Sequence, residues 1–96
     1  MDLNGKEIIE KGIGGLGKIK LIRALAEEER MMTIYGLHKK THLKREDIKR
    51  NLGDLIEIDW VREEKLGNVL YRLNRQNIIV QHLLTFFKNV EYIYHP

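Results

Sequence analysis

The chain has 96 residues, enough for one small domain with a single hydrophobic core. Hydrophobic residues make up 43% and charged residues 32%, and cysteine is absent, so we expect a folded protein without disulfide bonds or cysteine-bound metal. No apolar run approaches the roughly 18 residues that cross a bilayer, so a cytoplasmic protein without a membrane partner is expected. Abundant Lys, Glu, Arg and Ile with a single Pro are typical of thermophilic proteins.

The net charge of +3 is concentrated in one segment. Residues 38–50 hold six basic and two acidic side chains, so this segment carries +4 and the rest of the chain −1. A local excess of positive charge attracts phosphate groups. An ordinary solvated helix face is the alternative explanation for such a run.

The first part of the chain predicts an arm and two helices. Residues 1–15 hold the amphipathic stretch GKEIIEKG and lead into the glycine-rich IGGLG, which indicates an N-terminal arm or short helix. Hydrophobic residues at helical spacing predict a helix from Leu16 to about Glu28. Thr33 can cap a second helix that ends near Lys40, because its hydroxyl oxygen can accept a hydrogen bond from a free backbone N–H.

A tight turn over residues 41–43 and a third helix from about Lys44 to Ile58 follow. At 100° per residue, the apolar side chains of this helix point to one side, and they are Ile48, Leu52 and Leu55. The opposite side is polar, and basic in its N-terminal half. It holds Glu46, Lys49, Arg50, Gly53 and Glu57.

The remainder predicts a β-hairpin and a last helix. Trp60–Lys65 and Val69–Asn74 have the composition of short strands, and Leu66–Gly67–Asn68 supplies the turn. A helix over about Gln76–Asn89 carries more apolar residues than a small core needs, so a second copy of the chain is expected to cover it. The residues assigned to this dimer interface are Ile79, Leu83, Phe86 and Phe87.

This order of elements predicts a mainly α fold with a small β-hairpin, a winged helix-turn-helix. It has a three-helix core, a two-stranded wing and a C-terminal helix. We expect the winged domain to cover residues 16–75, and the dimerisation helix and tail to cover 76–96. One α-helix fills the major groove of B-DNA, so double-stranded DNA is the expected partner.

Four segments resemble the compact archaeal winged helix-turn-helix regulators of the ArsR and MarR type. They are GGLGKIKLIRALAEEE, IYGLHKKTHLKREDIKRNLGDLIEIDWV, EEKLGNVLYRLN and NIIVQHLLTFF, and together they span about residues 13–88. The resemblance implies a homodimeric regulator of transcription that binds specific DNA sequences and is not an enzyme. It also implies DNA-binding roles by position. These fall to Thr33 and Tyr35 at the start of the second helix, to Lys44, Arg45, Glu46, Lys49 and Arg50 in the recognition helix, and to Arg62, Lys65, Asn68 and Arg72 in the wing. The chemistry of lysine adds Lys39 and Lys40 as phosphate contacts.

The chemistry of these side chains separates their expected roles. Arginine bonds both O6 and N7 of guanine, which makes Arg45 and Arg50 the candidates for base reading. The lysines add affinity through phosphates but little specificity. Glu46 either accepts a hydrogen bond from cytosine N4 or simply complements the helix dipole.

Three positions depart from the family pattern. Lys44 stands where a capping Ser or Thr is usual, and Asp59 where glycine usually ends the recognition helix. Gly53 lies inside that helix, where glycine costs about 1 kcal/mol relative to alanine. Gly53 either allows a DNA backbone to approach closely or has no role.

Other motifs are weaker. Residues 12–18 have the G-x-x-x-x-G-K spacing of a phosphate-binding loop, but Ile19 replaces the Ser or Thr that binds Mg²⁺, so no nucleotide cofactor is expected. His38 and His42 lack further ligands, so no metal is expected. The sequence leaves the effector open. It also leaves open two alternatives: a winged helix that binds other proteins in a transcription or chromatin complex, or a non-specific nucleic-acid-binding protein.

Overall fold

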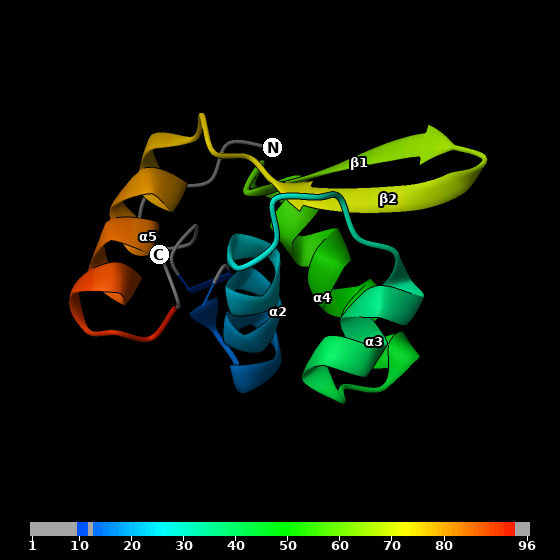
Figure 1. The fold of residues 1–96 in the computed structure, drawn as a ribbon, viewed down its shortest axis with the longest axis horizontal. Helices are drawn as coiled ribbons and strands as arrows, with labels where there is room; N and C mark the ends of the chain where they lie inside the picture. The colour runs from blue at the N-terminus through cyan, green and yellow to red at the C-terminus, as the bar shows by residue number, and fades with distance from the viewer. Residues whose placement is uncertain (1–9, 12, 94–96) are drawn as a thin grey trace.

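The computed structural model describes residues 10–11 and 13–93. In chain order its elements are α2 (Leu16–Ala26), α3 (Ile34–Thr41), α4 (Arg45–Glu57), β1 (Val61–Leu66), β2 (Asn68–Leu73) and α5 (Ile78–Asn89) (Figure 1). This confirms the predicted mainly helical fold with one hairpin. Most of the predicted N-terminal arm and the end of the predicted tail lie outside the described residues.

Side chains or charges satisfy free N–H groups at the start of α3, α4 and α5, whereas α2 begins at Gly15 without a side-chain cap. Thr33 caps α3 as predicted, since its Oγ1 accepts a hydrogen bond from the Gly36 N–H at 3.0 Å. Asn77 caps α5, with its Oδ1 accepting from the N–H groups of Ile79 and Val80 at 2.9 and 3.2 Å. Lys44 occupies the N-cap position of α4 but makes no side-chain hydrogen bond there, because a lysine side chain has no acceptor atom. Two acidic residues in the first turn of α4 complement the helix dipole instead.

The core lies between α2, α3, α4 and the base of the hairpin. Leu21, Leu37, Ile48 and Leu55 are fully buried, and Leu52 is nearly so. In Figure 1, α2 lies between α5 on one side and α3 and α4 on the other. The apolar stripe predicted for the third helix is therefore the surface that α4 buries against α2 and α3.

The two strands form an antiparallel hairpin that turns at Gly67, whose φ of 77° suits glycine. Tyr71 and Leu73 on β2 and Val61 on β1 turn inward to the core. Met32 adds an isolated bridge, exchanging two backbone hydrogen bonds of 2.8 Å with Tyr71. The loop between α2 and α3 is thereby tied to the wing.

Asp59 follows α4 in the left-handed region, with φ of 63°, at a position where glycine is usual in the family the sequence resembles. Its backbone carbonyl accepts hydrogen bonds from Asn74 Nδ2 at 3.0 Å and Asn77 Nδ2 at 3.3 Å. Asn74 is only 2% exposed, and its N–H donates to the Trp60 carbonyl at 2.8 Å. These bonds join α4, the wing and the start of α5 at one point.

The cap at Thr33 yields a stability prediction. Replacing Thr33→Ala removes the acceptor for the Gly36 N–H, and we expect the free energy of unfolding to fall by about 1 kcal/mol. Urea denaturation measures this loss. Thr85→Ala is the matched control, because Thr85 lies inside α5 and donates only to the Gln81 carbonyl. An equal loss at both positions would show that Thr33 has no special capping role.

Candidate nucleic-acid interface

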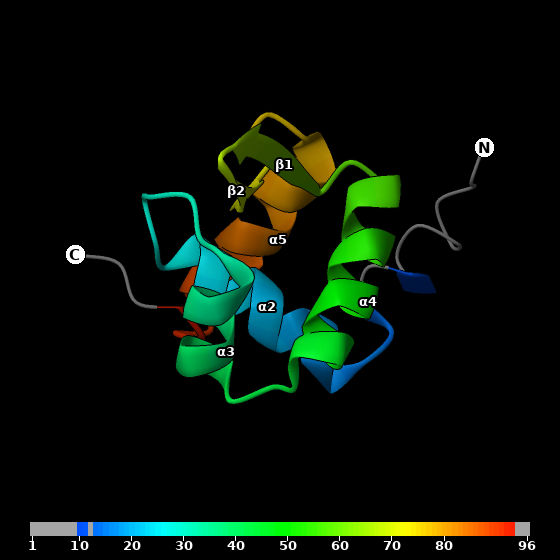
Figure 2. The same cartoon turned by 90° about the vertical axis from the view of Figure 1, so that its right-hand side faces the viewer.

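The outward face of α4 is polar and basic, as predicted. Arg45, Glu46, Lys49, Arg50 and Gly53 are all exposed. Figure 2 views the molecule from the end toward which the hairpin projects, and both α3 and α4 lie on this side. Nothing described lies within 4 Å of a Cβ built at Gly53, so the structure leaves open space at this position.

The ring of Tyr35 on α3 lies close to two cationic side chains, Lys39 on α3 and Arg45 on α4. Its ring is 56% exposed, with Arg45 Cζ 5.7 Å and Lys39 Nζ 5.5 Å from the ring centroid. Cations are attracted to the face of an aromatic ring at such distances. The sequence predicted these three residues as separate contacts, whereas the structure joins them into one cluster that holds Arg45 at the N-terminus of α4.

Arg50 is the other exposed candidate for base reading. Its Nη1 lies 3.1 Å from Asp47 Oδ1 one turn earlier, and its side chain is 67% exposed. An exposed pair of this kind is weak, worth about 0.3–0.5 kcal/mol. Arg50 can therefore exchange Asp47 for another acceptor at little cost.

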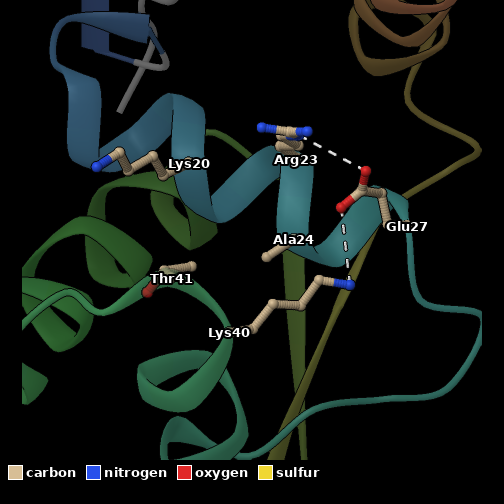
Figure 3. A pocket seen from close by; sticks show the side chains of 6 residues that line it. All are labelled: Lys20, Arg23, Ala24, Glu27, Lys40 and Thr41. Carbon is tan, nitrogen blue, oxygen red and sulfur yellow. Dashed lines mark ion pairs between the residues drawn. The ribbon is translucent and has the colours of Figure 1, made fainter. Parts of the chain in front are cut away.

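Lys40 lies in a different environment from the other basic residues of this segment. Its Nζ lies 3.2 Å from Glu28 Oε1 and 3.7 Å from Glu27 Oε1. With Lys20, Arg23, Ala24, Glu27 and Thr41 it lines a pocket of about 320 Å³ between α2 and α3 (Figure 3). These ion pairs join Lys40 on α3 to the end of α2, and the phosphate contact expected for Lys40 stays a prediction.

The four residues expected to act in the wing fall into two groups. Lys65 and Asn68 are exposed beside the turn at Gly67. Arg62 and Arg72 lie opposite each other at the base of the hairpin. The structure therefore places only Lys65 and Asn68 at the end of the wing.

The sequence assigned no role to two other residues of the hairpin, Leu66 and Tyr71. Leu66 is 70% exposed at the turn. Tyr71 is 8% exposed, and burial, followed by the nearby Glu63 carboxylate, raises the pKa of its hydroxyl above the ordinary value of 10.0. Tyr71 therefore belongs to the packed base of the wing, whereas Leu66 belongs to its exposed end.

The apolar residues of α5 divide between core and surface. Phe87 is 6% exposed, and its ring lies 4.9 Å from that of Tyr92, so it packs within the protomer and not on the surface predicted for dimerisation. Ile79 and Leu83 are half-buried, and Phe86 is 59% exposed. Ile78 and Val90, which were not assigned to the interface, are 61% and 55% exposed.

The histidines near the turn, possible metal sites and possible membrane helices complete the description. His38 Nδ1 lies 2.7 Å from the Leu43 carbonyl oxygen, so this histidine stabilises the turn before α4. Within residues 10–11 and 13–93, no group of three His, Asp or Glu side chains could hold a metal ion. None of the helices described there is both long and apolar enough to cross a membrane.

The ion pairs of Lys40 give the second prediction. Lys40→Met keeps an apolar stem but removes the charge, and we expect a loss of about 0.5 kcal/mol in stability at low salt. The loss should nearly vanish in about 1 M salt, because salt screens partly exposed charges. Urea denaturation at both salt concentrations tests this, with Lys39→Met as the control. A loss independent of salt would show that the ion pairs with Glu27 and Glu28 are not its cause.

Comparison with known proteins supports the fold. The sequence matches no family model and no curated protein. Among solved structures, it matches the crystal structure of an ArsR family transcriptional regulator with a TM-score of 0.63. The two chains are 13% identical, and the match covers 96% of each. The chain thus has a winged helix fold like that of this regulator, while the predicted archaeal and thermophilic origin stays a prediction.

Proposed function

We propose that the protein is a homodimeric regulator of transcription that binds specific sequences of double-stranded DNA. The observation that carries this proposal is the exposed basic face of α4, which continues through the Tyr35 cluster onto α3. In a winged helix-turn-helix, the N-terminal part of this helix reaches base edges in the major groove. The basic residues lie in that part.

The proposed contacts fall into three sets. Arg45, Glu46, Lys49 and Arg50 face the major groove, with the two arginines reading guanine. Thr33, Tyr35, Lys39 and Lys44 contact the DNA backbone. Lys65 and Asn68 contact the adjacent minor groove or backbone from the end of the wing.

The Tyr35 cluster explains how Arg45 reaches its target. A free arginine side chain loses conformational freedom when it makes two hydrogen bonds to one base. The Tyr35 ring restricts Arg45 before DNA arrives, so less freedom is lost on binding. Lys39 lies beside the same ring and adds positive charge for the phosphates.

Substituting Arg45 and Lys39 separates base reading from phosphate binding. We expect Arg45→Lys to keep general DNA affinity but lose about 1–3 kcal/mol of discrimination at one base pair, because lysine lacks the planar fork. Lys39→Ala should weaken binding to all duplexes alike and lower the slope of affinity against salt by about one ion. Selection from a random duplex pool measures the first effect, and salt titration the second. An unchanged preference in Arg45→Lys would remove Arg45 from base reading.

The proposed dimer rests on an apolar stripe along α5. Ile78 and Phe86 on α5 and Val90 at its C-cap are exposed at multiples of four residues, with the exposed His82 between Ile78 and Phe86, so they share one broad side of the helix. Half-buried Ile79 and Leu83 lie between this stripe and the core face. A second copy of the chain, packed through the same stripe about a two-fold axis, would cover it. The two recognition helices would then meet half-sites roughly 34–36 Å apart.

The dimer is tested by changing the stripe. Phe86→Glu places a charge at its centre, and we expect the protein to become monomeric in sedimentation velocity and to bind a palindromic site more weakly. Lys88→Glu is the matched control, because Lys88 is exposed elsewhere on α5. A Phe86→Glu protein that stays dimeric would exclude α5 as the interface.

The exposed apolar residues also fit the second candidate, a winged helix that binds another protein. Leu66 at the end of the wing and the α5 stripe are the surfaces such a partner would cover. The random duplex selection separates the candidates. A palindromic consensus supports the regulator, equal binding of all sequences supports a non-specific DNA-binding protein, and absence of binding supports the protein-binding module.

A further inference from the structure

A second pocket, of about 360 Å³, lies at the base of the wing. Three parts of the chain contribute to it: the end of α2 with its following loop, the base of the hairpin, and the connection from β2 to α5. Its polar lining residues are Glu28, Glu29, Arg62, Arg72, Arg75 and Gln76. Three arginines from separate segments therefore meet around one hollow.

Two of these arginines oppose each other directly. Arg62 on β1 is the register partner of Arg72 on β2, so both side chains leave the same face of the hairpin. Like charges in this arrangement destabilise a sheet. Arg62 has Asp59 at 3.5 Å, whereas among the described residues Arg72 has no acidic partner within ion-pair distance. A bound anion would turn this repulsion into attraction.

The third arginine is held in place. Arg75 Nη2 lies 3.2 Å from the Ala26 carbonyl and 3.5 Å from that of Leu25, at the C-terminal end of α2. Its own carbonyl accepts a hydrogen bond from Gln81 Nε2 at 2.9 Å. Arg75 thus caps α2 with one nitrogen and also lines the pocket, and among the described residues its other N–H groups make no further hydrogen bond.

The two acidic residues of the pocket do not neutralise the three arginines. Glu28 Oε1 lies 3.2 Å from Lys40, so this carboxylate already has a partner on α3. Glu29 is exposed. The lining consequently retains a net positive charge, and its guanidinium groups present the planar pairs of donors that match phosphate and carboxylate oxygens.

We propose that this pocket binds a small anion with at least two negative charges, carried by phosphate or carboxylate groups. Arg72 is its central ligand, with Arg62 and Arg75 on either side. The volume suits a small metabolite. A phosphate of the DNA backbone has the same chemistry. The pocket, however, contains no residue of α4 and lies at the opposite end of the hairpin from Lys65 and Asn68.

Such a ligand would connect the wing to the helix proposed for dimerisation. Arg62 and Arg72 belong to the hairpin, whereas Arg75 and Gln76 lead into α5. An anion bridging them would restrain the angle between the wing and α5, and would so change DNA affinity. This consequence rests on the proposed function, but the binding of the anion does not.

Titration calorimetry with pyrophosphate and citrate, at constant ionic strength, tests the site on the full chain. We expect saturable binding of at least one anion, weakened at least ten-fold by Arg72→Gln and unchanged by the control Lys88→Gln. Circular dichroism establishes that Arg72→Gln is folded. Absence of saturable binding by both anions, or equal binding to Arg72→Gln, would overturn the proposal.

A parallel measurement of duplex DNA binding distinguishes a small ligand from the DNA backbone as the source of the phosphate. If Arg72→Gln binds duplex DNA normally while losing the anion, the pocket serves a small ligand, as proposed. If neither anion binds and Arg72→Gln weakens duplex binding as much as Lys65→Gln does, the pocket contacts the DNA backbone and the proposal is wrong. Anion binding by a protein that binds no duplex would refute the proposed regulator and leave the pocket assignment standing.

Discussion

The carbonyl group of Asp59 is the point on which the arrangement of the functional elements depends. It lies just after the recognition helix, and it accepts hydrogen bonds from the side chains of both Asn74 and Asn77. Asn74 follows the last strand of the wing, and Asn77 caps α5. One backbone oxygen therefore relates the directions of α4, the wing and α5. Because Asn74 is almost fully buried, breaking its bonds would leave polar groups without water as a replacement.

The left-handed conformation of Asp59 makes this junction possible. It turns the chain sharply after α4, so that Trp60 and Val61 enter the core at once. Asp59 also places a carboxylate near Arg62, with 3.5 Å between Oδ1 and Nε. Glycine would adopt this backbone more easily, but it would provide no carboxylate there. Asp59, in place of the glycine usual in the family the sequence resembles, thus supplies an ion-pair partner for Arg62 at the base of the wing.

The same geometry separates charges that are adjacent in the sequence. The exposed basic residues and the Tyr35 cluster belong to α3 and α4, and these helices lie on the side toward which the wing projects (Figure 2). Arg62, Arg72 and Arg75 gather at the wing base. Lys40 pairs with Glu28 at the acidic end of α2. The proposed DNA surface and the proposed anion pocket are then distinct regions of one small domain, connected through the hairpin.

The sequence alone determined the elements, their order and much of the recognition helix. Helical periodicity separated Ile48 and Leu52 from Lys49 and Arg50, because burial on a helix follows its 3.6-residue repeat. The cap at Thr33 and the turn at Asp59 were also predictable, since both depend on local backbone chemistry. The untested contacts with DNA stay predictions.

Only the tertiary structure decided which partner each versatile side chain takes. Lys40 meets Glu28, which is twelve positions earlier in the chain, and no local pattern encodes that ion pair. Phe86 and Phe87 are neighbours on a helix that is apolar around much of its surface, so periodicity could not assign one to the core and the other to the exterior. Arg62 and Arg72 match family wing positions, yet strand register and the α2–α3 loop place them in a pocket. Local interactions set the elements, whereas long-range packing set the surfaces available for binding.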